Sequence, residues 1–238
     1  MKITRLSAHA WQLTRFGLFS AYLVREGDSF TLIDTGIPGT AERLLHAARR
    51  CGKEIDRILL THAHAAPIGS LDNLSHLLGR VEVAISRRAS RMLRKKPAQD
   101  RSLDSSEPQC KIKGSFPGAN TVPTHCVTDG ELYGSLRCFA TPGHTPGHFS
   151  FLDERDGTLY TGDALTTIGG KPHISGWSPW YWPIPNWATW HRPTAKASIQ
   201  RLYDQIPAET PIRRIAPVHG RILEGNRDLL EAALTEAI

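Results

Sequence analysis

Thr61-His62-Ala63-His64-Ala65-Ala66-Pro67-Ile68-Gly69 is the stretch around which this 238-residue chain is organised. It follows the apolar run Ile58-Leu59-Leu60 and carries two histidines two positions apart. Side chains at i and i+2 of an extended segment point the same way, so both imidazoles can reach one metal ion. Most isolated His-x-His pairs bind nothing, so the rest of the chain must decide whether this pair is a metal site.

Four further polar segments each follow a strand-like run, and their order along the chain carries the next inference. They are Leu32-Ile33-Asp34-Thr35-Gly36, Thr141-Pro142-Gly143-His144-Thr145-Pro146-Gly147-His148, Tyr160-Thr161-Gly162-Asp163 and Ala216-Pro217-Val218-His219-Gly220. With the first stretch, this order resembles the metallo-β-lactamase superfamily, from about Ser20 to His219. The resemblance implies an α/β fold, a four-layer αββα sandwich of two mixed β-sheets with helices on both outer faces.

One motif departs from the family pattern. The family writes its first motif as His-x-His-x-Asp-His, whereas Ala66 and Pro67 stand here in place of the Asp and the last His. Ala66 has no donor atom, and Pro67 has neither an imidazole nor a backbone N–H. The resemblance therefore implies an impaired second metal site, and it puts hydrolytic power itself in question.

The resemblance implies a metal role for five residues. His62, His64 and His144 would bind one zinc ion, and three histidines leave the fourth tetrahedral position to water, as in catalytic sites. Asp163 stands where the family places a bridging carboxylate, and His219 where it places a ligand of the second ion. Both also belong to the expected catalytic set. We expect one zinc ion and a second that is weak or absent; the competing interpretation of each histidine is a hydrogen-bonded loop residue.

Four further residues near the motifs receive structural interpretations first. Asp34 matches a family position that shapes the site without binding metal, and His148 is expected to be structural. His173 lies in the aromatic stretch 168–190, which holds five of the six tryptophans, and His191 lies at the expected helix start that follows it. That stretch is interpreted as a packed loop, as the wall of a substrate pocket lined by either histidine, or as a homodimer contact.

Composition sets the broad class. Hydrophobic residues make up 40% and charged residues 22% of the chain, as in ordinary soluble proteins, and the length suits a single domain over residues 1–238. The chain shows no signal-peptide pattern and no membrane-length apolar run, which places it in the cytoplasm. The four cysteines are widely spaced and are expected to be reduced thiols.

Periodicity predicts alternating strands and helices. Residues 21–24 and 30–33 are expected to form a hairpin, and residues 55–60 and 81–85 further strands. Helices are expected at 40–48 and 69–78, and a basic helix capped by Ser86 and running to about Lys96. After a long loop, strands at 122–127, 136–140, 149–152 and 158–160 are expected to form the second sheet. A helix at 190–204 capped by Thr189, a strand at 212–216 and a helix at 226–237 close the chain.

The leading hypothesis is a zinc-dependent hydrolase using zinc-bound hydroxide on a small ester, lactone, thioester or amide. The alternative is a degenerate member that binds a ligand or partner with little or no turnover. A nucleic-acid partner is the weakest hypothesis. It rests only on the formal charge of +6 and on the basic helix. Such a charged helix face is more often exposed to solvent than bound to nucleic acid.

Overall fold

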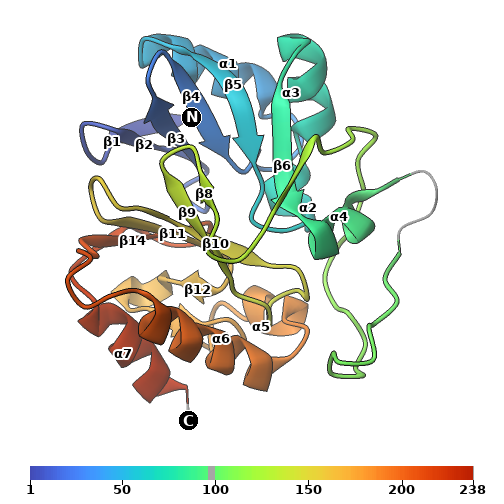
Figure 1. Ribbon diagram of the computed structural model, residues 1–238, viewed down its shortest axis with the longest axis vertical. Coiled ribbons are helices and arrows are strands. Elements are labelled where there is room, and N and C mark those ends of the chain that lie inside the picture. The colour runs from blue at the N-terminus through green and yellow to red at the C-terminus, as the bar shows by residue number, and fades with distance from the viewer. Residues whose placement is uncertain (96–99, 238) are drawn as a thin grey trace. The chain divides into compact units, whose positions relative to one another are not determined.

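The computed structural model describes residues 1–95 and 100–237. It contains two compact units: Met1–Asp100 with Phe116–Val127, and Arg101–Ser115 with Thr128–Ile238. Figure 1 identifies their elements. Within the described residues, every helix is too short or too polar to cross a lipid bilayer.

The first unit is built on a seven-stranded mixed sheet in the order β1-β2-β3-β4-β5-β6-β7. Neighbouring strands from β1 through β4 are antiparallel, and neighbouring strands from β4 through β7 are parallel. The strands are β1 Lys2–Arg5, β2 Ala10–Arg15, β3 Phe19–Glu26, β4 Ser29–Ile33, β5 Glu54–Leu59, β6 Glu82–Ser86 and β7 His125–Val127. The helices are α1 Ala41–Arg50, α2 Ala65–Ile68, α3 Leu71–Leu78 and α4 Arg87–Leu93.

Local sequence explains these elements. The β3–β4 hairpin turns at Gly27, whose φ of +55° favours glycine, and Tyr22 pairs with Ile33 across it. Helix α1 buries one apolar stripe against the unit's core: Ala41, Leu44, Leu45, Ala47 and Ala48. The alternation of strand and helix delivers the polar stretch after β5 to the carboxyl end of a parallel strand.

The second unit contains a six-stranded mixed sheet in the order β15-β14-β11-β10-β9-β8, in which only β11 and β14 are parallel. Its strands are β8 Leu132–Tyr133, β9 Leu136–Ala140, β10 Phe149–Asp153, β11 Thr158–Gly162, β14 Arg214–Pro217 and β15 Leu223–Glu224. A two-stranded sheet pairs β12 Leu165–Thr166 with β13 His173–Ile174. The helices are the 3-10 turn η1 Ile168–Gly170, α5 Ile184–Ala188, α6 Arg192–Gln205 and α7 Asp228–Glu236.

One apolar core joins the sheet of this unit to its two long helices. Leu159 and Ile215 of the sheet pack in the same buried cluster as Ile199 and Leu202 of α6 and Leu230 of α7. Burying each such side chain is worth roughly 1.5–3 kcal/mol. The core therefore fixes the strand ends from which the polar loops of this unit leave.

Three sequence predictions need correction. Residues 122–127 were expected in the second sheet, but β7 is shorter and pairs with β6 of the first sheet, Ala84 opposite His125. Thr124 sets this pairing, because its amide donates to the carbonyl of Val83 and its hydroxyl accepts from the amide of Val83. A short apolar run does not reveal which sheet it joins. Strands β1 and β2 were not foreseen.

The basic helix and the helix after the aromatic stretch also differ from prediction. Ser86 does cap α4, by accepting from the amide of Ala89, but the helix ends at Leu93 and Arg94 is extended. Lys96 lies outside the described residues. Helix α6 begins at Arg192, and its cap is His191, not Thr189, because the His191 ring accepts from the amide of Thr194. Pro193 suits that first turn, where an N–H would have no helical partner.

Candidate metal centre

His62 and His64 of the first unit lie in the turn between β5 and α2. Their rings are 4.8 Å apart between centroids, and their side chains are 0% and 6% exposed. His64 is extended, with φ −72° and ψ 164°, and its ring stacks edge-on to Phe116 at 4.4 Å. The His-x-His pair is therefore a buried pair on extended backbone, not two surface side chains.

Asp34 orients His62 through Thr61. The Asp34 carboxylate accepts the amide N–H of Thr61 at 2.9 Å and its hydroxyl at 2.9 Å, and the same hydroxyl oxygen lies 3.0 Å from His62 Nδ1. A carboxylate only accepts, so the single hydroxyl proton of Thr61 goes to Asp34 and the oxygen accepts the Nδ1–H of His62. His62 thus carries its lone pair on Nε2, the form in which that nitrogen can bind a metal.

The broken part of the motif is firmly packed. The carbonyl of Pro67 accepts both the amide N–H of Thr35 at 2.6 Å and its hydroxyl at 2.7 Å. A Cβ added at Gly69 would lie 2.6 Å from the nitrogen of Pro38 and 2.7 Å from the carbonyl oxygen of Gly36. Ala66 and Pro67 therefore lie in the short helix α2, which is tied to Thr35 at Pro67 and closely packed after its end at Gly69.

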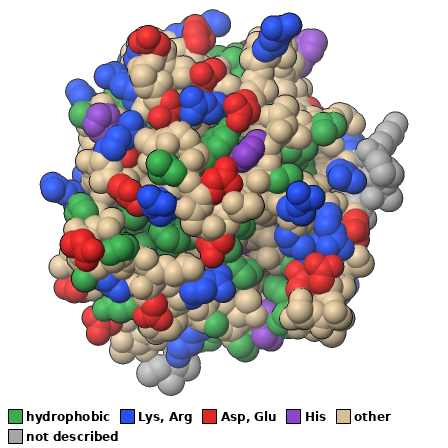
Figure 2. Space-filling model, viewed as in Figure 1, with side chains coloured by type: hydrophobic (Ala, Val, Ile, Leu, Met, Phe, Trp, Pro, Cys, Tyr) green, Lys and Arg blue, Asp and Glu red, His purple; other side chains and the backbone are tan. Residues whose placement is uncertain are grey.

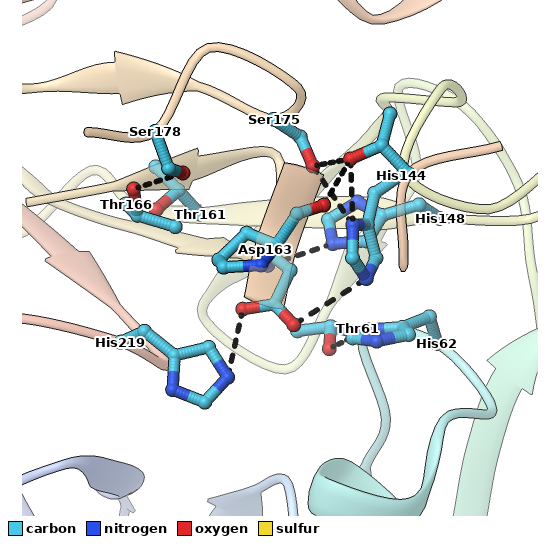
Figure 3. Close-up of polar contacts among 12 residues, drawn as sticks. Thr61, His62, His144, His148, Thr161, Asp163, Thr166, Ser175, Ser178 and His219 are labelled. Carbon is cyan, nitrogen blue, oxygen red and sulfur yellow. Dashed lines mark hydrogen bonds and ion pairs between the residues drawn. The ribbon is translucent and has the colours of Figure 1, made fainter. Parts of the chain in front are cut away.

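The second unit brings together the other three predicted residues (Figure 3). His144 follows β9, Asp163 follows β11 and His219 follows β14. Asp163 lies between the two rings, with Oδ2 3.5 Å from His144 Nε2 and Oδ1 3.6 Å from His219 Nε2. Two ligands bound tetrahedrally at about 2.0–2.2 Å from zinc lie roughly 3.4 Å apart. These donor atoms therefore have the chemistry and the spacing of metal ligands.

The Asp163 side chain is 6% exposed. Burial raises the pKa of its carboxyl, and the neighbouring His219 lowers it. Removing a carboxylate from water is costly unless a cation or hydrogen-bond donors compensate it. This carboxylate is thus suited to a position beside a cation.

His148 supports Asp163 instead of joining the donor atoms. Its Nε2 accepts the amide N–H of Asp163 at 3.0 Å, and its Nδ1 lies 2.8 Å from the hydroxyl of Thr141. The structural interpretation of His148 is therefore confirmed. His173 contacts Glu236 of α7 at 3.1 Å, and His191 caps α6.

The sequence analysis missed the residues that support His144. Ser175 Oγ lies 2.8 Å from His144 Nδ1, and Thr189 Oγ1 lies 2.7 Å from Ser175 Oγ. They are 31 and 45 positions from His144, and no motif marks them. The signal for Thr61 was available, since it directly precedes His62.

Comparison with known proteins identifies the family. The model of the metallo-beta-lactamase superfamily matches residues 15–231. The chain is 41% identical to uncharacterized protein YobT of Bacillus subtilis over 100% of this chain and 99% of that protein. It is 29% identical to probable metallo-hydrolase YybB of the same organism, over 70% of this chain and 74% of that protein.

Solved structures agree with this. A metallo-beta-lactamase from Pontibacter korlensis superposes with a TM-score of 0.68 at 18% identity, over 99% of this chain and 98% of its own. A di-iron-bound form of TTHA1623 superposes with a TM-score of 0.65 at 24% identity, over 93% and 97%. The predicted fold class of two mixed sheets with helices is thus confirmed, and the chain belongs to the metallo-β-lactamase superfamily.

Proposed function

We propose that the two units together form one metallo-β-lactamase domain and that the protein is a zinc-dependent hydrolase. In this proposal His62, His64 and His144 hold one zinc ion. The observation that carries the proposal is that each unit contains a buried imidazole held by a hydrogen bond to a hydroxyl group. His62 is oriented by Thr61, His144 is hydrogen-bonded by Ser175, and the donor atoms around Asp163 have ligand spacing. Superfamily membership supports the same donor set.

When bound, zinc would lower the pKa of a coordinated water to about 7 and so make a nucleophile available at neutral pH. Asp163 and His219 then act on the reacting groups. The backbone N–H of Asp163 donates to His148 Nε2, which holds in place the residue whose carboxylate would orient the attacking water. His219, within 3.6 Å of that carboxylate, can hold or pass a proton at Nε2. The substrate class we propose is a small ester, lactone, thioester or amide.

We propose one zinc ion per chain and a second ion that is weak or absent. Asp163 and His219 are the remaining protein donors for a second ion, because Ala66 and Pro67 supply none. Three or four protein ligands are usual for a zinc site. Since TTHA1623 is described in a di-iron form, iron must be measured beside zinc.

The test combines metal analysis with turnover. Protein purified without chelator is analysed for zinc and iron, and is then assayed on a panel of chromogenic esters, lactones, thioesters and amides. Near one equivalent of zinc with turnover that chelation removes and zinc restores supports the proposal. Metal-bound protein without turnover on any class of substrate would move the conclusion to the second candidate.

That second candidate is a family member that binds a ligand or partner with little or no hydrolysis. The replacement of a motif Asp by Ala66 favours it, because the family residue at this position also contacts the attacking water in many members. The two candidates differ in turnover, not in fold. Ligand-induced thermal stabilisation without product formation would identify the binder.

The partner we propose is a small molecule. On the face shown in Figure 2, Lys and Arg side chains lie among Asp and Glu side chains, an arrangement that does not favour nucleic acid. Within the aromatic stretch, Trp180 and Trp187 are 88% and 72% exposed. We propose that these exposed tryptophans form a homodimer contact. Light scattering tests this by comparing Trp180→Ser with the parent protein, and we expect the variant to lose the dimer.

A further inference from the structure

We propose that Ser175 and Thr189 form a hydroxyl relay that fixes the tautomer of His144, so that its Nε2 is prepared as a metal ligand before the metal arrives. The proposal deepens the function given above and rests on it for the metal step alone. All residues concerned lie in the second unit, and His144, Ser175 and Thr189 are at most 1% exposed.

The relay runs from a carbonyl to the imidazole. Thr189 Oγ1 lies 2.6 Å from the carbonyl oxygen of Pro185, Ser175 Oγ lies 2.7 Å from Thr189 Oγ1, and His144 Nδ1 lies 2.8 Å from Ser175 Oγ. Thr189 Oγ1 is 3.5 Å from His144 Nδ1, too long for a strong hydrogen bond. Ser175 is therefore the direct partner of the ring.

Counting protons gives the direction of each bond. A carbonyl oxygen only accepts, so the hydroxyl proton of Thr189 goes to Pro185 and its oxygen must accept from Ser175. Ser175 has then used its only proton, so its oxygen accepts from His144. Neutral His144 must carry its proton on Nδ1, which leaves the lone pair on Nε2, the nitrogen that faces Asp163 at 3.5 Å.

The backbone holds the relay in register. The amide of Trp190 donates to the carbonyl of His144, and the amide of His191 donates to the carbonyl of Gly143, both at 3.0 Å. A Cβ at Gly143 would lie 2.3 Å from Cα of Ala195, so α6 packs directly on this turn. The end of the aromatic stretch is thus clamped to the loop that carries His144.

His148 gives an internal comparison within the same unit. It also carries its proton on Nδ1, because its Nε2 accepts the amide of Asp163. Its relay passes from Thr141 to Ser150 and ends at the carbonyl of Thr161. The two rings share a tautomer and differ in the partner of Nε2. This nitrogen accepts a backbone N–H in His148 and lies 3.5 Å from the Asp163 carboxylate in His144.

The first measurement needs no variant. Long-range proton–nitrogen NMR spectra of metal-free, 15N-histidine-labelled protein distinguish protonated from unprotonated ring nitrogens, and His144→Asn assigns the signal by its loss. We expect His144 with Nδ1–H and a bare Nε2. An Nε2–H tautomer in the parent would overturn the proposal.

The second measurement breaks the relay one step away from the ring. In Thr189→Val, Ser175 loses the oxygen that takes its proton and becomes able to donate to His144 Nδ1. The tautomer then shifts toward Nε2–H, and zinc affinity measured by chelator competition falls about 10- to 100-fold. Thr189→Ser keeps the hydroxyl and should restore both readouts.

Thr166→Val is the matched control, since Thr166 is a buried threonine whose hydroxyl forms a hydrogen bond of 3.2 Å with the hydroxyl of Ser178. It should leave the tautomer and the zinc affinity as in the parent. An unchanged tautomer and affinity in folded Thr189→Val would overturn the relay; if that variant does not fold, the parent tautomer still decides. A parent with Nδ1–H that binds neither zinc nor iron would refute the proposed metal function and leave the tautomer assignment standing.

Discussion

The two units support their site residues in different ways. In the first unit, His62 and His64 are two positions apart, and the ring of His62 is supported by the hydroxyl of its neighbour Thr61, which donates to Asp34. In the second unit, His144, Asp163 and His219 come from three separate loops, and the support of His144 comes from a segment more than thirty residues away, 31 positions to Ser175. The direct partner of His62 is thus its neighbour in the chain, with Asp34 27 positions from Thr61, whereas even the direct partner of His144 comes from a distant segment.

The units also differ in what they have lost. The second unit contains Asp163 and His219, the two donors proposed for a second ion, whereas the first has Ala66 and Pro67 where the family motif has Asp and His. Both residues lie in the short helix α2, where the carbonyl of Pro67 accepts two hydrogen bonds from Thr35.

The largest effect should come from removing single ligands. His62→Ala, His64→Ala and His144→Ala should each abolish zinc binding, because two remaining histidines are too few to hold the ion tightly. His219→Ala should keep the first ion and reduce turnover or the weak second ion. Metal analysis of the four purified variants makes the comparison; equal metal loss in all four would contradict this ligand assignment.

A smaller loss should follow from Thr61→Val in the first unit. Without the hydroxyl, the Nδ1–H of His62 loses its acceptor, and zinc affinity should fall about 10- to 100-fold. The measurement is a chelator competition titration beside Thr189→Val, its counterpart in the second unit. Parent-like affinity in a folded Thr61→Val protein would show that the local support does not matter.

Repair of the motif should give a gain of at most one ion. Ala66→Asp with Pro67→His raises the protein donors for the second ion from two to four, counting Asp163 as a bridge. Metal content should rise toward two equivalents, with activity gaining less reliably, because Pro67 is buried and its carbonyl is held by Thr35. If the folded double variant binds no more metal than the parent, the turn itself has diverged, which favours the ligand-binding candidate.

The smallest effect concerns a hydroxyl group that does not support any of the site histidines. Among the described residues, the buried Oγ1 of Thr31 has no hydrogen-bond partner. An unsatisfied buried hydroxyl costs about 1–3 kcal/mol, so Thr31→Val should raise the free energy of unfolding by about 1 kcal/mol. Denaturant titration measures it, and zinc affinity should stay unchanged; a destabilised variant would mean that the hydroxyl is satisfied in solution.

The sequence by itself determined the family, the fold class and the order of the polar segments. Motif residues such as Asp34 and His144 end strands whose periodicity is legible, and short-range signals such as the Ser86 cap act within a few positions. These features depend on neighbours along the chain, which the sequence displays directly.

The tertiary structure alone decided which sheet β7 joins and which residues orient the imidazoles. Strand β7 pairs with β6 through contacts across 41 positions, and Ser175 reaches His144 across 31. A serine or threonine hydroxyl carries no sequence mark of its partner, because its role follows from where packing places its single proton and its lone pairs. The sequence thus names the metal-binding side chains, and the fold sets the hydrogen-bond directions that prepare them.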